Sequence, residues 1–203
     1  MKKIIAATKN KNKIKEFKEI LPDFDIVTQE EAGIDIDVEE TGTTFIENAR
    51  LKAMAIFEKT GIPALADDSG LEVYALGGAP GIYSARYGGE GLDDKGRTAL
   101  LLENMKDVDD ELRGAQFVCS IVFVTKEKVY EAQGVCEGVI AHEPKGENGF
   151  GYDPVFYVPH MGKTTAEMSS GEKNSISHRG KALRNLAEML KARGVEPPMP
   201  FSC

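Results

Sequence analysis

Cysteine is scarce in this sequence, and the cysteines present lie far apart. They are Cys119, Cys136 and Cys203, so there is neither a CxxC motif nor a cysteine–histidine cluster. A disulfide framework needs paired cysteines, and a zinc site needs closely spaced cysteine and histidine ligands. The sequence therefore argues against both. The two cysteines within apolar runs are expected to pack as small core residues.

Long apolar segments are absent as well. No stretch approaches the roughly 20 apolar residues that cross a bilayer, and the apolar run before Thr8 is too short for a secretion signal. We therefore expect a cytoplasmic protein with no membrane partner. The length of 203 residues fits one domain. We place a two-lobed domain at residues 1–194 and a loose, proline-rich tail at residues 195–203.

Positive charge is missing from one part of the chain and concentrated in another. Residues 19–48 contain ten acids and no lysine or arginine, whereas residues 1–18 contain seven lysines and one acid. The formal net charge of -8 argues against nucleic acid as a partner. A basic segment beside an acidic one suits a polyanion bound together with a metal. Simple solvation of charged surface elements is the alternative.

The central feature of the sequence is an apolar run that ends in two adjacent carboxylates, Asp67 and Asp68. We interpret it as a buried strand that ends at a polar turn, Ser69–Gly70, and opens onto a site. Adjacent carboxylates repel each other, so they need a cation or a shared proton, and Mg²⁺ suits carboxylate oxygens. A solvated acidic turn is the alternative interpretation.

The N-terminal segment has the form of a phosphate-binding site. A strand at residues 3–8 is followed by a polar turn and by an amphipathic helix that Pro22 ends. The free N–H groups at the start of such a helix bind anions, and Lys13 adds a positive charge. Asn10 and Asn12 could cap the helix or adopt a left-handed turn. A plain helix cap with solvated lysines is the alternative.

Several further elements are expected. Thr44 and Glu47 form a capping box that opens a helix ending near Gly61. Asn48 and Lys52 share a face of this helix, which could point to the site, although we expect it to point to water. The preceding loop can bring Glu40 to the same site as Asp68. The other expected elements are strands at 25–28, 116–125, 129–140 and 155–158, with the middle two forming a ribbon, and helices at 92–105 and 181–193.

Two later segments contain groups suited to a nucleobase. The glycine-rich loop at residues 146–154 exposes Phe150, whose ring can stack on a base, unless its aromatic residues fold back on the core. Lys173, His178 and Arg179 gather hydrogen-bond donors near the start of the last helix, which suits the carbonyl edge of a purine. A capped, solvated helix start is the alternative.

Taken together, these motifs carry a resemblance. They are TxNxxK at 8–13, EETG at 39–42, FIENA at 45–49, ADDSGL at 66–71, GGAPGIYSARY at 77–87, GFGYD at 149–153 and SISHRG at 175–180. In this order they resemble the inosine/xanthosine triphosphate pyrophosphatase family, also called HAM1-like or RdgB-like, over residues 3–192. The resemblance implies an α/β fold with an elongated mixed sheet in two lobes, flanked by helices, and a nucleotide cleft between the lobes.

The resemblance also implies a reaction and a site. The reaction is Mg²⁺-dependent hydrolysis of ITP, dITP or XTP to the monophosphate and pyrophosphate by a cytoplasmic homodimer. Glu40 and Asp68 resemble the metal ligands, and Asp68 also resembles the general base. Lys9 and Asn12 stand where many members have glycine. The implied substrate contacts are Thr8, Lys9, Asn10, Lys11, Asn12, Lys13, Ser69, Phe150, Gly151, Tyr152, Asp153, Lys173, His178 and Arg179.

The residues and the resemblance lead to the same mechanistic hypothesis, in which water activated near Asp68 attacks the α-phosphorus. The 6-keto group of the base would meet the donors of the last motif, and adenine would leave them unpaired. Two rival functions stay open. One is a phosphatase of another class that uses Asp67 or Asp68 as nucleophile and releases orthophosphate, and the other is a non-catalytic nucleotide-binding module.

Overall fold

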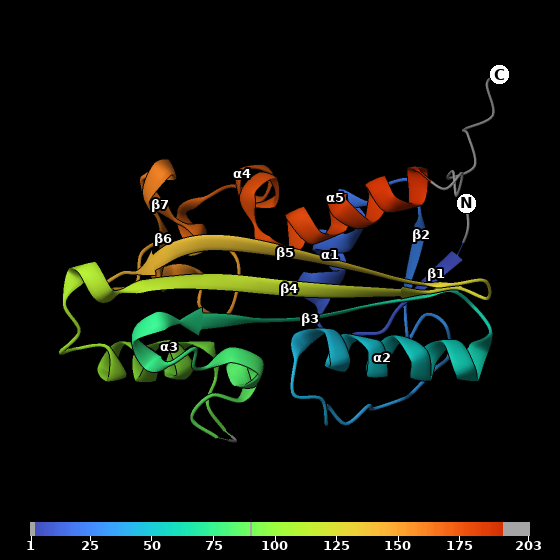
Figure 1. The fold of residues 1–203 in the computed structure, drawn as a ribbon, viewed down its shortest axis with the longest axis horizontal. Coiled ribbons are helices and arrows are strands. Elements are labelled where there is room, and N and C mark those ends of the chain that lie inside the picture. Colours follow the sequence, from blue (N-terminus) through green and yellow to red (C-terminus); the bar gives the residue numbers. More distant parts are fainter. Residues whose placement is uncertain (1–2, 90, 193–203) are drawn as a thin grey trace. The chain divides into compact units, whose positions relative to one another are not determined.

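The computed structural model describes residues 3–89 and 91–192, so the tail expected at residues 195–203 lies outside the described residues. The chain forms a seven-stranded sheet in the order β2-β1-β3-β4-β5-β6-β7, with helices on its faces (Figure 1). β1 pairs in parallel with β2 and β3, whereas β6 pairs antiparallel with β5 and β7. The sheet is therefore mixed, which confirms the predicted α/β fold class.

The elements have the following bounds. The strands are β1 (Lys3–Ala6), β2 (Asp25–Thr28), β3 (Ala64–Val73), β4 (Gly114–Val124), β5 (Val129–Ile140), β6 (Phe156–Val158) and β7 (Lys163–Thr164). The α-helices are α1 (Lys11–Ile20), α2 (Phe45–Thr60), α3 (Asp94–Asn104), α4 (Ser170–Ile176) and α5 (His178–Lys191). None of the described helices is both long and apolar enough to span a membrane.

Local sequence signals fix most helix ends. α2 begins with the predicted capping box of Thr44 and Glu47 and ends at Gly61, which has a left-handed φ of 66°. The last two helices differ from expectation. Ser169 caps a separate short helix, α4, which carries Lys173, and α5 begins at His178 instead of residue 181. The capping box at Ser169 explains this extra helix start.

Strand β3 corrects one expectation. The segment Ser69–Gly70, which we expected to turn, continues the strand, and β3 runs without a break from Ala64 to Val73. Turn-forming residues are overridden here because β3 is an interior strand of the sheet and most of its residues are buried. The strand that does end at the phosphate-binding turn is β1, which pairs with β3 at Ile5 and Ala6.

The chain divides into two compact units. Unit 1 comprises residues 1–68, 119–134 and 179–203, and unit 2 comprises residues 69–118 and 135–178. Unit 1 has an apolar core on each face of its part of the sheet: α1 and α5 pack on one face, and α2 packs on the other (Figure 1). Each face of the sheet in unit 1 is thus covered by helices, as α/β folds require.

Unit 2 has a core of its own. Leu71, Phe117 and Phe156 from three strands pack with Leu101 of α3 and with Met168, which precedes α4. The two described cysteines are buried, Cys119 in the core of unit 1 and Cys136 in that of unit 2. This confirms their expected role as small core residues.

Candidate functional site

The two adjacent carboxylates point to opposite faces of β3. Leu65 packs in the core on the side of α1 and α5, whereas Ala64 and Ala66 pack in the core on the side of α2. Because side chains alternate along a strand, Asp67 lies on the same face as Leu65, and Asp68 lies on the same face as Ala66. The contacts of the two acids, given below, agree with this assignment. Each acid therefore contacts its own set of cations, Lys13 and Arg179 at Asp67 and Lys52 at Asp68.

Asp67 is fully buried in a network of charged side chains. Its Oδ2 accepts hydrogen bonds from Nε and Nη2 of Arg179 at 3.0 and 2.8 Å, and Nη1 of Arg179 also donates to Glu16 Oε2 at 2.5 Å. The Lys13 ammonium lies 3.1 Å from Asp67 Oδ1, without hydrogen-bond geometry. Burial opposes ionisation of Asp67, but Lys13 and Arg179 outweigh it, so the pKa of Asp67 is lowered.

Asp68 lies on the α2 side, where it meets a lysine and an amide. Lys52 Nζ lies 3.2 Å from Asp68 Oδ1 and 2.8 Å from Glu40 Oε1, and Asn48 Nδ2 donates to Asp68 Oδ2 at 3.3 Å. Burial raises the pKa of Asp68, and the Glu40 carboxylate adds to this while Lys52 opposes it. A carboxylate with a raised pKa is a better proton acceptor, as a general base requires.

The donor set at Asp68 fits a hard divalent cation. A single ammonium already contacts both the Glu40 and the Asp68 carboxylates, so the two are close enough to share one cation. In the part of the chain that the structure describes, no group of three or more histidine, cysteine or acidic residues is arranged to hold a metal. Mg²⁺ is typically bound by one or two carboxylates, with water and substrate phosphates completing its shell.

The predicted phosphate-binding segment forms the turn between β1 and α1. Asn10 is the N-cap of α1: its Oδ1 accepts from the backbone N–H groups of Asn12 and Lys13 at 3.0 and 3.3 Å. Its own N–H donates to Thr8 Oγ1 at 3.1 Å. Among the described residues other than glycine, none has a positive φ, so Asn10 and Asn12 cap and extend the helix and form no left-handed turn. Lys9 and Lys11 are exposed.

In unit 2, Asp153 organises the glycine-rich loop. Its Oδ2 accepts from the Phe150 N–H at 2.8 Å and from Lys173 Nζ at 2.7 Å, and its Oδ1 accepts from Thr165 Oγ1 at 2.8 Å. The Lys173 ammonium also lies over the Phe150 ring, 4.8 Å from its centre. A Cβ on Gly149 would stand 2.0 Å from Asp153 Oδ2, so only glycine fits there. The loop thus joins Phe150, Asp153 and Lys173 in one cluster.

The other residues predicted to bind the nucleoside lie in different surroundings. Tyr152 is buried, and its hydroxyl donates to Ser84 O at 2.8 Å, so this ring folds back on the core whereas Phe150 is half-buried. Gly151 N–H donates to Asp94 Oδ2 at 2.9 Å. His178 is buried and stacks on Phe117, with ring centres 4.7 Å apart. Ser69 lies half-buried in β3, next to Asp68 in the chain.

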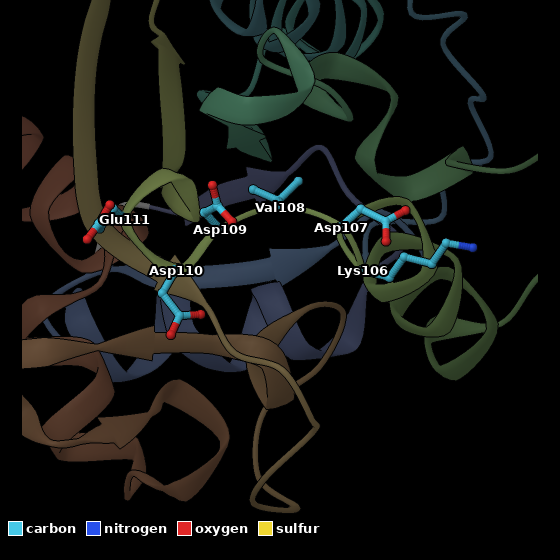
Figure 2. A pocket seen from close by; sticks show the side chains of 6 residues that line it. All are labelled: Lys106, Asp107, Val108, Asp109, Asp110 and Glu111. Atoms are coloured by element: carbon cyan, nitrogen blue, oxygen red, sulfur yellow. The ribbon is translucent and has the colours of Figure 1, made fainter.

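A surface pocket of unit 2 involves none of the predicted site residues. Figure 2 shows that it is lined by one acidic loop, and that the side chains on this loop point in different directions. The lining residues are Lys106, Asp107, Val108, Asp109, Asp110 and Glu111. Carboxylates that diverge in this way do not converge on a common ligand, so the pocket does not compete with the site in unit 1.

Sequence reasoning missed three members of the site. Lys52 and Asn48 were expected to face water, but both side chains contact Asp68. Their spacing of four residues did place them on one helix face, and that signal could have been combined with the proximity of Glu40. Glu16 was not singled out, because its partner Arg179 is 163 residues away in the chain. Nothing in the local sequence indicates such a pairing.

The chain is similar to several known proteins over almost its entire length. A profile of the Ham1 family matches residues 4–189. Proteins named dITP/XTP pyrophosphatase from Photorhabdus laumondii and Escherichia coli K12 are 49% and 50% identical, each over 94% of this chain and 99% of the relative. Solved structures of HAM1 proteins from Coxiella burnetii and Staphylococcus aureus match with TM-scores of 0.86 and 0.85, at 46% and 45% identity, over 95% of this chain and 100% of each of theirs. The chain belongs to the Ham1 family.

Proposed function

We propose that this protein is a nucleoside-triphosphate pyrophosphatase that hydrolyses dITP, XTP and ITP to the monophosphate and pyrophosphate, and so removes non-canonical purine nucleotides. The names of its relatives support the substrate class. The observation that carries the proposal lies in unit 1. A helix start suited to anions is joined, through the ion pair of Lys13 with Asp67, to the strand that bears Asp68.

In this proposal unit 1 binds the triphosphate and performs the chemistry. The segment at residues 8–13 binds phosphate oxygens through side-chain donors, the positive end of the α1 dipole and the charges of Lys9, Lys11 and Lys13. The ammonium of Lys13 is held near Asp67 by charge and without hydrogen-bond geometry, which leaves it able to turn toward a phosphate. Thr8, Asn10 and Asn12 complete this segment.

Unit 2 supplies the nucleoside contacts in the same proposal. The ring of Phe150 stacks on the base, and Lys173 and His178 donate to the 6-keto group of hypoxanthine or xanthine. Ser69 contacts the substrate beside the reacting phosphate, and Gly151, Tyr152 and Asp153 shape the loop. Arg179 was also predicted to contact the base. Its hydrogen bonds with Asp67 and Glu16 support a role in unit 1 instead, in which it fixes Asp67.

The reaction is attack of water on the α-phosphorus. A new bond forms between the water oxygen and phosphorus, the bond from phosphorus to the bridging oxygen breaks, and pyrophosphate leaves with the electron pair. Asp68 accepts the water proton. Glu40 and Asp68 would hold a divalent cation, proposed to be Mg²⁺, which when bound neutralises phosphate charge and lowers the pKa of coordinated water.

The proposal is tested by incubating the protein and Mg²⁺ with dITP, XTP, ITP, GTP or ATP and separating pyrophosphate from orthophosphate. We expect pyrophosphate and the monophosphate from the first three nucleotides and much slower turnover of ATP. Adenine presents an amino group where the other bases present a carbonyl, which leaves the donors of the site unpaired. Release of orthophosphate, or equal turnover of ATP and ITP, would overturn the proposal.

The variant Asp68→Asn tests the proposed general base. Asparagine has nearly the same shape but accepts no proton, so we expect turnover to fall by a factor of about 10²–10⁴. Circular dichroism and thermal unfolding establish whether the variant is folded. Turnover close to that of the wild type would remove Asp68 from this role.

Asp67 has little support as the nucleophile of the rival phosphatase mechanism. Asp67 is fully buried and bound by Arg179, so it is not accessible as a nucleophile. We further propose, from the family resemblance, that the protein acts as a homodimer in the cytoplasm. Light scattering coupled to size-exclusion chromatography tests the first of these, and a mass of about 22.1 kDa for the active species would contradict it.

A further inference from the structure

The buried amide of Asn48 lies between two parts of the candidate site. Asn48 is in the first turn of α2 and is fully buried. Its Oδ1 accepts the N–H of Gly42 at 2.8 Å, and its Nδ2 donates to Asp68 Oδ2 at 3.3 Å. Because a backbone N–H can only donate, the Gly42 contact requires the amide oxygen on that side. The amide nitrogen must then face Asp68.

Gly42 belongs to the loop that carries Glu40. This loop approaches α2 so closely that a Cβ on Gly42 would stand 2.7 Å from Asn48 Oδ1 and 2.7 Å from Glu47 Cβ. The backbone of the loop is therefore seated directly on the Asn48 amide. Glu40 stands two residues before this anchor point, so a shift of the anchor would move its carboxylate.

Asn48 and Lys52, one helical turn apart, each contact both the loop and Asp68. Lys52 binds the Glu40 and Asp68 carboxylates through its charge, so it competes with any cation that these two carboxylates hold. Asn48 is neutral and binds the backbone of the loop and the other oxygen of Asp68. Its two hydrogen bonds are compatible with a cation at the carboxylates.

We propose that Asn48 is a positioning residue: its single amide fixes the orientation of Asp68 and, through Gly42, the place of the loop that bears Glu40. The inference rests on the proposed function, in which these two carboxylates act together. Asn48 does not touch the reacting atoms in this account. It acts through Asp68 and Glu40, in the way that outer hydrogen-bond partners orient the ligands of metal sites.

Asn48→Ala and Asn48→Asp separate the two contacts. The alanine variant loses both, and we expect kcat for dITP and the affinity for Mn²⁺ alone, measured by electron paramagnetic resonance without nucleotide, each to fall about 10–100-fold. The aspartate variant keeps an acceptor for Gly42 N–H but loses the donor to Asp68. We expect kcat to fall as in the alanine variant, and Mn²⁺ affinity to fall less, because the loop that bears Glu40 keeps its contact. The ratio of dITP to dATP turnover should not change in either variant.

A substitution in the loop tests the contact between Gly42 and Asn48 from the other side. In Gly42→Ala the new methyl group pushes against Asn48 Oδ1, so we expect weaker Mn²⁺ binding although Asn48 and Asp68 are both present. Asn185→Ala is the matched control, since this exposed amide in unit 1 donates to Gln133 O at 2.9 Å, outside the site. We expect wild-type kcat and Mn²⁺ affinity from it.

The outcomes separate this inference from the proposed function. Wild-type kcat and Mn²⁺ affinity in Asn48→Ala or in Asn48→Asp would overturn the positioning role, even if thermal stability fell. If these variants resemble the wild type while Asp68→Asn is inactive, the inference fails and the proposed function stands. If the wild-type protein releases no pyrophosphate from dITP, the proposed function fails first.

Discussion

Asp67 and Asp68 are neighbours in the sequence, but their pKa values are shifted in opposite directions. Asp67 faces Arg179 and Lys13, which stabilise its ionised form and lower its pKa. Burial raises the pKa of Asp68, and Lys52 does not fully compensate. The first arrangement gives a permanent anion that holds cations in place, and the second gives a group able to accept a proton.

This difference predicts a loss of stability in Asp67→Asn. The change leaves buried Arg179 with one acid fewer, and breaking a buried ion pair costs about 3–5 kcal/mol. Because the pKa of Asp67 is lowered on folding, its contribution is present above pH 3.8, the ordinary pKa of an aspartate, and is lost as pH falls toward the folded-state pKa. Urea unfolding near pH 7 and near pH 3 measures both effects. The difference in free energy of unfolding between wild type and variant should be smaller at the lower pH.

Asp35→Asn is the control for this experiment. Asp35 also pairs with a lysine, Lys9, at 3.3 Å, but its side chain is 96% exposed. An exposed pair contributes at most about 1 kcal/mol, so the free energy of unfolding should change little at either pH. Equal losses of unfolding free energy in the two variants would show that burial of the Asp67 network does not determine its contribution to stability.

At the level of elements, the start of α1 combines a helix cap with a proposed anion site. Asn10 accepts hydrogen bonds from the first turn of the helix, and a phosphate would be attracted to the same region. A substitution of Asn10 that adds a negative charge but preserves the helix cap should therefore change phosphate binding without changing the free energy of unfolding.

We predict that Asn10→Asp keeps the stability of the protein but binds substrate poorly. Aspartate caps helices as well as asparagine does, so the free energy of unfolding should stay within about 0.5 kcal/mol. Its negative charge repels a triphosphate, and we expect KM for dITP to rise at least tenfold. Asn10→Ala should instead lose about 1 kcal/mol of stability. An unchanged KM in Asn10→Asp would contradict an anion site at this helix start.

The elements show how far local sequence carries a prediction. The helix α2 was predictable because Thr44, Glu47 and Gly61 are local signals. The course of β3 through Ser69 and Gly70 was not, because their turn propensity is outweighed by position within the sheet. The partners of the site were equally hidden. Arg179 and Asp67 are separated by 112 residues, and only the folded chain brings them together.

At the level of the whole molecule, the proposed substrate contacts are divided between two compact units. Unit 1 contains the acids and the phosphate-binding turn, and unit 2 contains the cluster of Phe150, Asp153 and Lys173. This division predicts that the affinity for the polyphosphate and the affinity for the base can be changed independently.

Phe150→Ala tests the division. Loss of base stacking, worth about 1–3 kcal/mol, should raise KM for dITP roughly 5- to 150-fold. Inhibition by inorganic tripolyphosphate, which has no base, should keep its wild-type inhibition constant. Tyr74→Ala, which removes an aromatic side chain that is 55% exposed in the same unit, should change neither value. A parallel rise in both constants would mean that Phe150 supports the whole site and not the base alone.

The alternation of side chains along β3 has a consequence for sequence change. A deletion of one residue between Ala64 and Asp67 would move each later side chain to the opposite face of the strand. Asp68 would then meet the guanidinium of Arg179, and the polar but uncharged Ser69 would stand where the proton acceptor is required. Insertions and deletions should therefore be far more damaging in this short segment than most substitutions, although they leave both aspartates in the chain.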